Sequence, residues 1–74
     1  MAEFFYGESK HGRMAYIEVE RHGQRATAST EASAITGRQL LNALRERYPD
    51  YDWTIETHGD KYFGYRMGYG TRRE

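Results

Sequence analysis

The sequence predicts an α+β domain with a four- to five-stranded antiparallel sheet, in the order β-β-β-α-β-β, and one helix packed on one face. Two observations carry this prediction. Segments with the alternation of half-buried strands occur in neighbouring pairs joined by short turns, and such local hairpins produce antiparallel sheets. Between the two pairs lies one segment with the period of an amphipathic helix. A helix with one apolar stripe and a sheet with one apolar face bury each other.

Three strands are expected before the helix. The first is a short aromatic run within residues 3–8, and the second, residues 13–21, alternates between apolar and polar side chains. The inward side of this second strand consists of Ala15, Ile17 and Val19, and the other side of Tyr16, Glu18 and Glu20. The third strand covers residues 24–30, where the small inward residues Ala26 and Ala28 leave room for the helix.

Each of the three histidines precedes a glycine, in His11-Gly12, His22-Gly23 and His58-Gly59. We interpret these pairs as turns in which glycine supplies a positive φ angle. A turn at His22-Gly23 predicts that Glu20 pairs with Arg25 and Val19 with Ala26. Successive turns of a meander lie at opposite ends of a sheet, so the three histidines should not converge. A pairing of His11 with His58 is the only metal hypothesis this topology leaves, and we expect no metal and no cofactor.

The helix is expected between Thr36 and Pro49. Thr36 and Gln39 have the spacing of a capping box, in which each side chain accepts a hydrogen bond from the other residue's backbone N–H. An apolar stripe follows at helical spacing: Leu40, Leu41, Leu44 and Tyr48. Pro49 ends the helix because the residue before a proline is pushed out of helical geometry.

Two strands are expected after the helix. Residues 53–57 form the first, with Trp53, Ile55 and Thr57 on one face. Residues 61–67 form the second, with Phe63, Tyr65 and Met67 on one face, and if these face the core then Tyr62 and Arg66 are exposed. Residues 68–74 are expected to be a frayed basic tail. Residues 1–74 then form a single domain.

Composition excludes several classes of protein. The eleven basic and eleven acidic residues cancel, unlike the basic balance of proteins that bind nucleic acid by neutralising phosphates. The chain has no cysteine, which excludes disulfides, thiolate catalysis and cysteine-ligated zinc. No apolar run approaches the roughly 20 residues of a membrane span, and the amino end lacks the features of a signal peptide. We therefore expect a cytoplasmic protein with no membrane partner.

No arrangement of residues indicates catalysis, and we expect this protein not to be an enzyme. The serines Ser9, Ser29 and Ser33 lie in no recognised nucleophile context, and the glycines form no phosphate-binding pattern. Carboxylates cluster in sequence around the fourth strand, at Asp50, Asp52, Glu56 and Asp60. Acid–base chemistry would require a cleft that perturbs their pKa values. We interpret three of them as an acidic contact patch or a solvated loop: Asp50, Asp52 and Asp60.

The segment from Lys61 to Tyr69 interleaves aromatic and cationic side chains. Part of it is exposed in either register, because strand alternation buries only every second residue. Exposed tyrosine and arginine are enriched at the hot spots of protein interfaces. We therefore predict protein binding through these contacts: Tyr62, Tyr65, Arg66, Tyr69, Asp50, Asp52 and Asp60. The alternative is a small nucleic-acid-binding module in which the same aromatics stack on bases while Arg66, Arg72 and Arg73 contact phosphates.

The stretch from Tyr16 to Gly23, followed by an alanine-rich return strand and a single helix, is similar in layout to small phage-encoded anti-CRISPR proteins. This resemblance covers about the middle half of the chain. It implies a non-catalytic, stoichiometric inhibitor that covers a nucleic-acid-binding or recruitment surface of a CRISPR effector complex. The expected partner is then an effector subunit, and no functional residue is carried over because no motif is shared. Exposed sheet edges also leave homodimerisation open.

Overall fold

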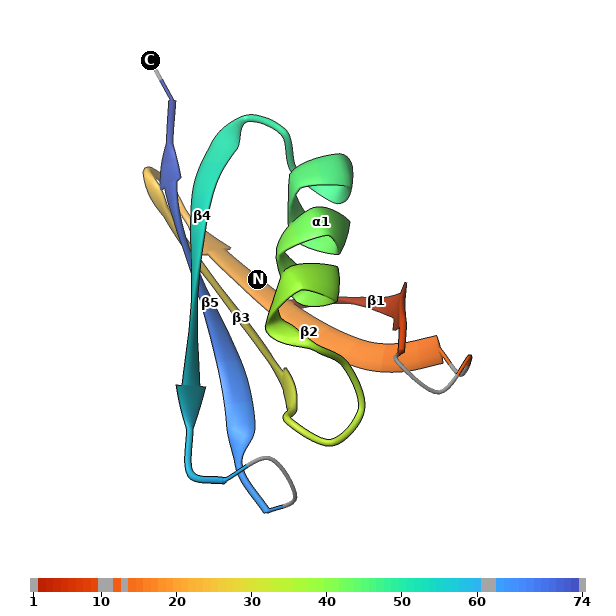
Figure 1. Ribbon diagram of the computed structural model, residues 1–74. Helices are drawn as coiled ribbons and strands as arrows, with labels where there is room; N and C mark the ends of the chain where they lie inside the picture. The colour runs from red at the N-terminus through yellow and green to blue at the C-terminus, as the bar shows by residue number, and fades with distance from the viewer. Residues whose placement is uncertain (1, 10–11, 13, 61–62, 74) are drawn as a thin grey trace.

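The computed structural model describes residues 2–9, 12, 14–60 and 63–73. Their elements are β1 (Ala2–Glu8), β2 (Met14–His22), β3 (Arg25–Glu31), α1 (Gly37–Arg47), β4 (Tyr51–His58) and β5 (Tyr65–Arg72). All five strands pair antiparallel in one sheet of order β1-β2-β3-β5-β4, and α1 lies on one side of it (Figure 1). The predicted fold class is confirmed, and the aromatic run near the amino end does form a strand.

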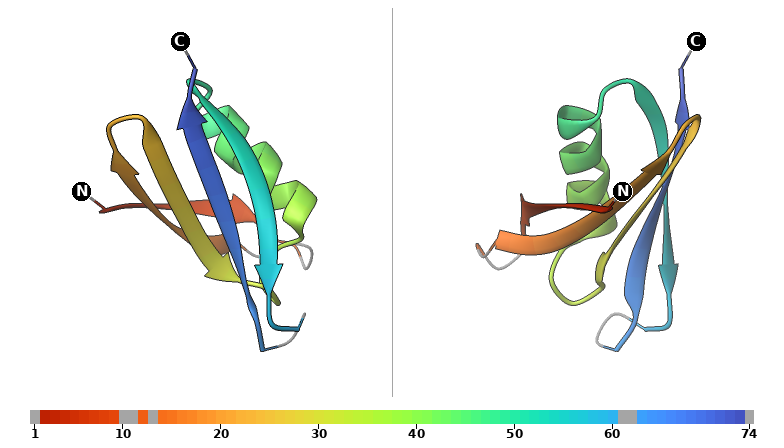
Figure 2. Two further views of the ribbon diagram at one scale, coloured as in Figure 1. Left: turned by 90° about the vertical axis from the view of Figure 1, so that its left-hand side faces the viewer. Right: turned by 180° about the vertical axis from the view of Figure 1, so that it is seen from behind.

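The sheet is strongly twisted, so its two edges lie on different sides of the helix. β1 and β2 cross below α1, while β4 and β5 run along its other side (Figures 1 and 2). The helix contacts β4 and β5 and also reaches β1. No helix in the described part of the chain is long and apolar enough to cross a membrane.

The core lies between α1 and the concave side of the sheet. Its largest fully buried side chains are Ile17, Val19, Ile35, Leu40 and Leu44. Small residues line the centre of the sheet on the side of α1: Ala26 pairs with Gly70 and Ala28 with Gly68. A Cβ atom on Gly68 would lie 2.7 Å from Cδ1 of Leu44. Leu44 of α1 therefore packs directly on the backbone of β5 at Gly68, beside Ala28, whereas Trp53 covers Gly70 beside Ala26.

The β2–β3 hairpin turns one residue later than predicted. His22 pairs with Arg25, so the turn is Gly23-Gln24, with Gly23 at φ 57° in the first central position that a type II′ turn reserves for glycine. The predicted pairs were wrong, since Val19 lies opposite Ala28 and Glu20 opposite Thr27. A shift of two residues along the partner strand leaves every side chain on its predicted face. Gly12 and Gly59 also have positive φ angles, 74° and 81°, which confirms the turn interpretation.

The capping box predicted at the start of α1 is confirmed. The Gln39 N–H donates to Oγ1 of Thr36 over 3.1 Å, and the Thr36 N–H donates to Oε1 of Gln39 over 3.1 Å. The helix ends at Arg47, with Tyr48 as its cap directly before Pro49. Along the predicted stripe, Leu40, Leu44 and Tyr48 are buried and Leu41 is half-buried.

The carboxyl-terminal strand differs most from expectation. β5 begins at Tyr65, and Phe63 lies in the turn before it with 92% of its surface exposed. Tyr65 and Met67 lie on the face away from α1, opposite His58 and Glu56, so a core position for them is wrong.

Residues 68–73 also differ from the expected frayed tail. Gly68 and Gly70 are buried inside β5, and the Arg73 N–H donates to the Asp50 carbonyl over 2.8 Å. Glycine contributes no apolar side chain to a sequence pattern. Here the absence of a side chain is what allows Leu44 and Trp53 to pack against the strand.

Candidate partner-binding face

No described helix or strand covers the face of the sheet that points away from α1, and we call it the open face. Cross-strand register places on it six large apolar side chains that are 39% to 63% exposed: Phe4, Tyr6, Met14, Tyr16, Tyr65 and Tyr69. Exposed apolar residues scattered singly are normal on any protein, whereas a group on one face marks an interaction site. The open face is therefore the candidate site.

Three of these rings form one cluster at the β1–β2 end of the open face. Tyr6 and Tyr16 are direct cross-strand partners, with ring centroids 5.3 Å apart and an interplanar angle of 70°. Phe4 lies 5.3 Å from Tyr16 at 32°. We call Phe4, Tyr6 and Tyr16 the aromatic cluster. Their mutual packing fixes the rings in place, and about half of each surface stays exposed.

A second apolar row follows β5, through Tyr65, Met67 and Tyr69. The His58 ring on β4 stacks on Tyr65, with centroids 5.1 Å apart and planes within 16°. Nε2 of His58 lies 3.4 Å from the Glu56 carboxylate. Between this row and the aromatic cluster, the middle of β3 contributes the short side chains of Thr27 and Ser29.

Carboxylates surround both apolar groups. Strand register places these carboxylates of β2, β3 and β4 on the open face: Glu18, Glu20, Glu31, Asp52 and Glu56. His22 hydrogen-bonds to Glu20 and holds the pKa of that carboxyl below its usual value. The described arginines on this side are Arg25 and, just beyond β5, Arg73, which is bound to Asp52. Although the net charge of the chain is zero, the open face is therefore acidic and aromatic.

A hollow of about 320 Å³ opens where β2 and β3 separate. The two strands pair only as far as Glu18 and Ser29, and beyond this pair the Thr30 hydroxyl donates to the Tyr16 carbonyl over 2.9 Å. We call this space the carboxylate hollow; it is lined by Tyr16, Glu18, Ser29, Thr30, Glu31 and Ala34. Two carboxylates beside an aromatic ring and a hydroxyl suit a guanidinium or ammonium group.

The predicted contact residues are only partly brought together. Tyr65 and Tyr69 lie on the open face, and Tyr62 lies outside the described residues. Arg66 is on the opposite face. Its Nε donates to the Ile35 carbonyl over 2.7 Å and its Nη1 to the Thr57 hydroxyl, so it fastens the segment before α1 to β4.

The three predicted aspartates do not form one patch. Asp50 and Asp52 lie at the start of β4 and Asp60 beyond its far end. Each also makes a hydrogen bond within the protein. The backbone carbonyl of Asp50 accepts from the Arg73 N–H, and the Asp52 carboxylate binds the Arg73 guanidinium. Oδ1 of Asp60 accepts from the Phe63 N–H over 2.7 Å. The acidic surface is instead made of glutamates on β2, β3 and β4. Sequence alternation had placed Glu18 and Glu20 on the outward side of β2.

The described histidines lie apart, His22 at the β2–β3 turn and His58 near the β4–β5 turn at the other end of the sheet. His11, the remaining member of the metal hypothesis, lies outside the described residues. Among described residues, no group of three or more potential ligands could hold a metal ion. Comparison of the chain with protein-family models, with curated proteins and with solved structures finds no match.

Proposed function

We propose that this protein is a non-catalytic, protein-binding inhibitor that docks its open face on a basic surface of a partner. The observation that carries the proposal is the combination of exposed, mutually fixed rings with carboxylates on one face. Clustered aromatic side chains supply the desolvated centre of an interface, and charge complementarity directs the approach and excludes wrong partners.

The carboxylate hollow gives the proposal a specific contact. An arginine or lysine of the partner that enters it meets Glu18 and Glu31 from two adjacent strands and the ring of Tyr16. A guanidinium can bind a carboxylate through two parallel hydrogen bonds and lie against an aromatic ring at the same time. Basic surfaces that bind nucleic acid are rich in arginine.

Nucleic acid fits the open face less well as a partner. Phosphates would approach glutamates on β2, β3 and β4, while Arg66 is directed to the other face. The resemblance to anti-CRISPR proteins narrows the proposal to one class of partner, a cytoplasmic CRISPR effector complex whose nucleic-acid-binding or recruitment surface is covered. This narrower form rests on that resemblance alone.

The proposal is tested by titrating the isotope-labelled protein with a short arginine–glycine peptide as a probe for basic surfaces. Amide signals of Tyr16, Glu18 and Glu31 should shift. The double variant Glu18→Gln/Glu31→Gln should bind the peptide at least about tenfold more weakly, as expected when a hot-spot charge contact is removed. Asp50→Asn, in the turn before β4, removes a carboxylate that lines neither the carboxylate hollow nor the pocket beside β1 and α1, and should bind as the wild type does.

Unchanged open-face signals at saturating peptide would overturn the proposal. Oligothymidylate serves as the second probe, and stronger, salt-sensitive shifts with it would favour the nucleic-acid alternative. The narrower form is tested with purified CRISPR effector complexes, whose binding to target DNA the wild type should block at equal stoichiometry. If no effector complex binds, the anti-CRISPR assignment fails independently of the peptide result.

A further inference from the structure

β1 is an edge strand, and its residues from Phe5 to Glu8 line a groove together with one side of α1. It pairs only with β2 in the described part of the chain. Every second residue of β1 therefore directs its N–H and C=O groups to the edge away from β2. Between the residues that the structure describes, no backbone–backbone hydrogen bond is made on that side of β1. Proteins commonly protect such edges with charges or proline, and the middle of β1, from Phe4 to Gly7, has neither.

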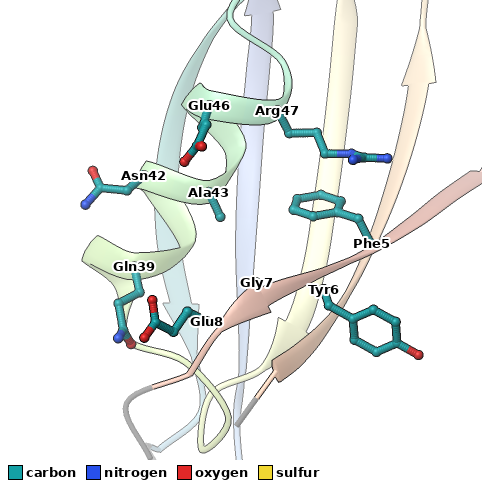
Figure 3. Close-up of a pocket in the computed structure, with 9 residues that line it drawn as sticks. All are labelled: Phe5, Tyr6, Gly7, Glu8, Gln39, Asn42, Ala43, Glu46 and Arg47. Carbon is teal, nitrogen blue, oxygen red and sulfur yellow. The ribbon is translucent and has the colours of Figure 1, made fainter. Parts of the chain in front are cut away.

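A groove of about 510 Å³ lies beside β1 and the flank of the helix, which itself meets the inner face of β1 where Ala43 approaches Gly7 (Figure 3). Its apolar walls include Phe5 and Gly7 from β1 and Ala43 from α1. The Arg47 guanidinium lies 5.1 Å from the centre of the Phe5 ring and closes one end. We call this space the β1–α1 groove. The Tyr6 side chain is directed away from it, toward the open face (Figure 3).

The groove has the dimensions of a short extended peptide. Its strand side runs from Phe5 to Glu8, about 10 Å at roughly 3.4 Å per residue. A segment of about four residues in strand conformation spans the same length.

Both walls can satisfy the backbone of such a segment. β1 offers its unpaired N–H and C=O groups on one side. On the other side the helix presents the amide side chains of Gln39 and Asn42. The Gln39 carbonyl oxygen is used in the capping box, which leaves its NH₂ group to donate. An added strand has two hydrogen-bonding edges, and this groove supplies partners for both.

The charges of the groove restrict the side chains it accepts. Glu8 and Glu46 stand on its rim against the single guanidinium of Arg47, which lies over the Phe5 ring. An acidic segment would be repelled, and a neutral or basic one attracted.

We propose that the β1–α1 groove binds an extended segment of a protein partner, about four residues long and neutral to basic, by adding it to β1 as a further strand. The main-chain hydrogen bonds of β1 would supply affinity, and Glu8 and Glu46 the preference for charge. This site is distinct from the open face and does not rest on the function proposed for that face.

The test uses a capped peptide of alternating lysine and valine as the probe, added to the isotope-labelled protein. Backbone amides from Phe5 to Glu8 and the side-chain amides of Gln39 and Asn42 should shift together. The same peptide carrying N-methyl groups along one edge loses its donors on that edge. Two such peptides are compared, each methylated on a different edge. The peptide methylated on the edge that pairs with β1 should bind at least about tenfold more weakly than the unmethylated peptide. The analogue with glutamate in place of lysine should not bind.

Two helix variants provide the matched control. Asn42→Trp fills the groove and should abolish binding of the peptide, whereas Arg45→Trp, on an exposed helix position outside the groove lining, should leave binding unchanged. Shifts confined to the open face, or equal binding of both methylated peptides, would overturn the proposal. Concentration-dependent shifts of β1 amides in the protein alone would also overturn it, because the occupant would then be a second copy of this chain.

Discussion

At the scale of single residues, Glu3 is a carboxylate that binds two side chains from other elements. Its Oε2 accepts a 2.7 Å hydrogen bond from the Tyr48 hydroxyl, and its Oε1 binds the guanidinium of Arg21. These contacts join β1 to β2 and to the carboxyl end of α1. The Tyr48 hydrogen bond, with Arg21 second, holds the pKa of Glu3 below its usual value, and burial together with Glu3 raises the pKa of Tyr48.

This lowered pKa predicts a pH-dependent effect of Glu3→Gln. A carboxyl group with a lower pKa in the folded than in the unfolded state contributes stability above its unfolded pKa and loses it as pH falls through its folded pKa. The melting temperature of the variant should therefore lie furthest below that of the wild type at neutral pH, and the difference should close below about pH 4. Circular dichroism melting curves between neutral pH and pH ~2 measure this difference.

Tyr48→Phe removes the hydroxyl and keeps the ring, so it tests whether the hydrogen bond is the cause. Its effect and that of Glu3→Gln should be less than additive because they share one contact. A melting-temperature difference that stays constant across the pH range would show that Glu3 acts through packing instead.

At the scale of elements, the parts predicted from the sequence are those in which local pattern and tertiary role agree. Alternation along β2 and the capping box of α1 were read correctly, because the same side chains that set the pattern fill the core or cap the helix. β5 was misplaced because its inward positions hold Arg66, Gly68 and Gly70, none of which is apolar and bulky.

The candidate site could be predicted from the sequence only in part, because local pattern again does not determine all of its contacts. Alternation assigned Tyr16 and Glu18 to the outward side, but the continuous aromatic run of β1 has no period that separates Phe4 and Tyr6 from Phe5. The approach of Glu31 to Tyr16 depends on where β2 and β3 separate, which no local pattern encodes. The unpaired edge of β1 likewise follows from strand order, not from the residues of β1.

The glycines of β5 lead to a prediction about packing. A Cβ atom on Gly70 would lie 2.9 to 3.1 Å from three atoms of the Trp53 ring. That ring is buried and its Nε1 donates to the Tyr48 carbonyl over 3.1 Å, so it cannot move without losing the bond. Gly70→Ala should therefore destabilise the fold by about 1–3 kcal/mol, the usual cost of overpacking. Urea unfolding followed by tryptophan fluorescence measures this change.

The neighbouring position supplies the control for this prediction. Thr71 is exposed on the open face, and Thr71→Ala should change the unfolding free energy by no more than about 0.5 kcal/mol. If Gly70→Ala costs no more than Thr71→Ala, then the Trp53 ring has room that its contacts with the strand do not indicate.

At the scale of the whole molecule, charge is segregated between two sides. The open face carries mainly glutamates, whereas α1 contains Arg38, Arg45 and Arg47 against the single acid Glu46. The eleven positive and eleven negative charges of the chain thus cancel in number but not in space. A protein of this kind can present one sign of charge to a partner and remain neutral overall, and only a measurement sensitive to local charge detects the difference.

Ion-exchange chromatography at neutral pH and low salt provides such a measurement. We expect the wild type to be retained on both anion and cation exchangers, and released from both when salt shortens the Debye length to about 8–10 Å. Arg25→Gln and Arg38→Gln remove the same charge from opposite sides of the molecule. Arg25→Gln should mainly strengthen retention on the anion exchanger, because Arg25 stands among the carboxylates of the open face. Arg38→Gln should mainly weaken retention on the cation exchanger. Identical elution shifts for the two variants would mean that the net charge of the protein, and not its segregation between two sides, determines binding to a charged surface.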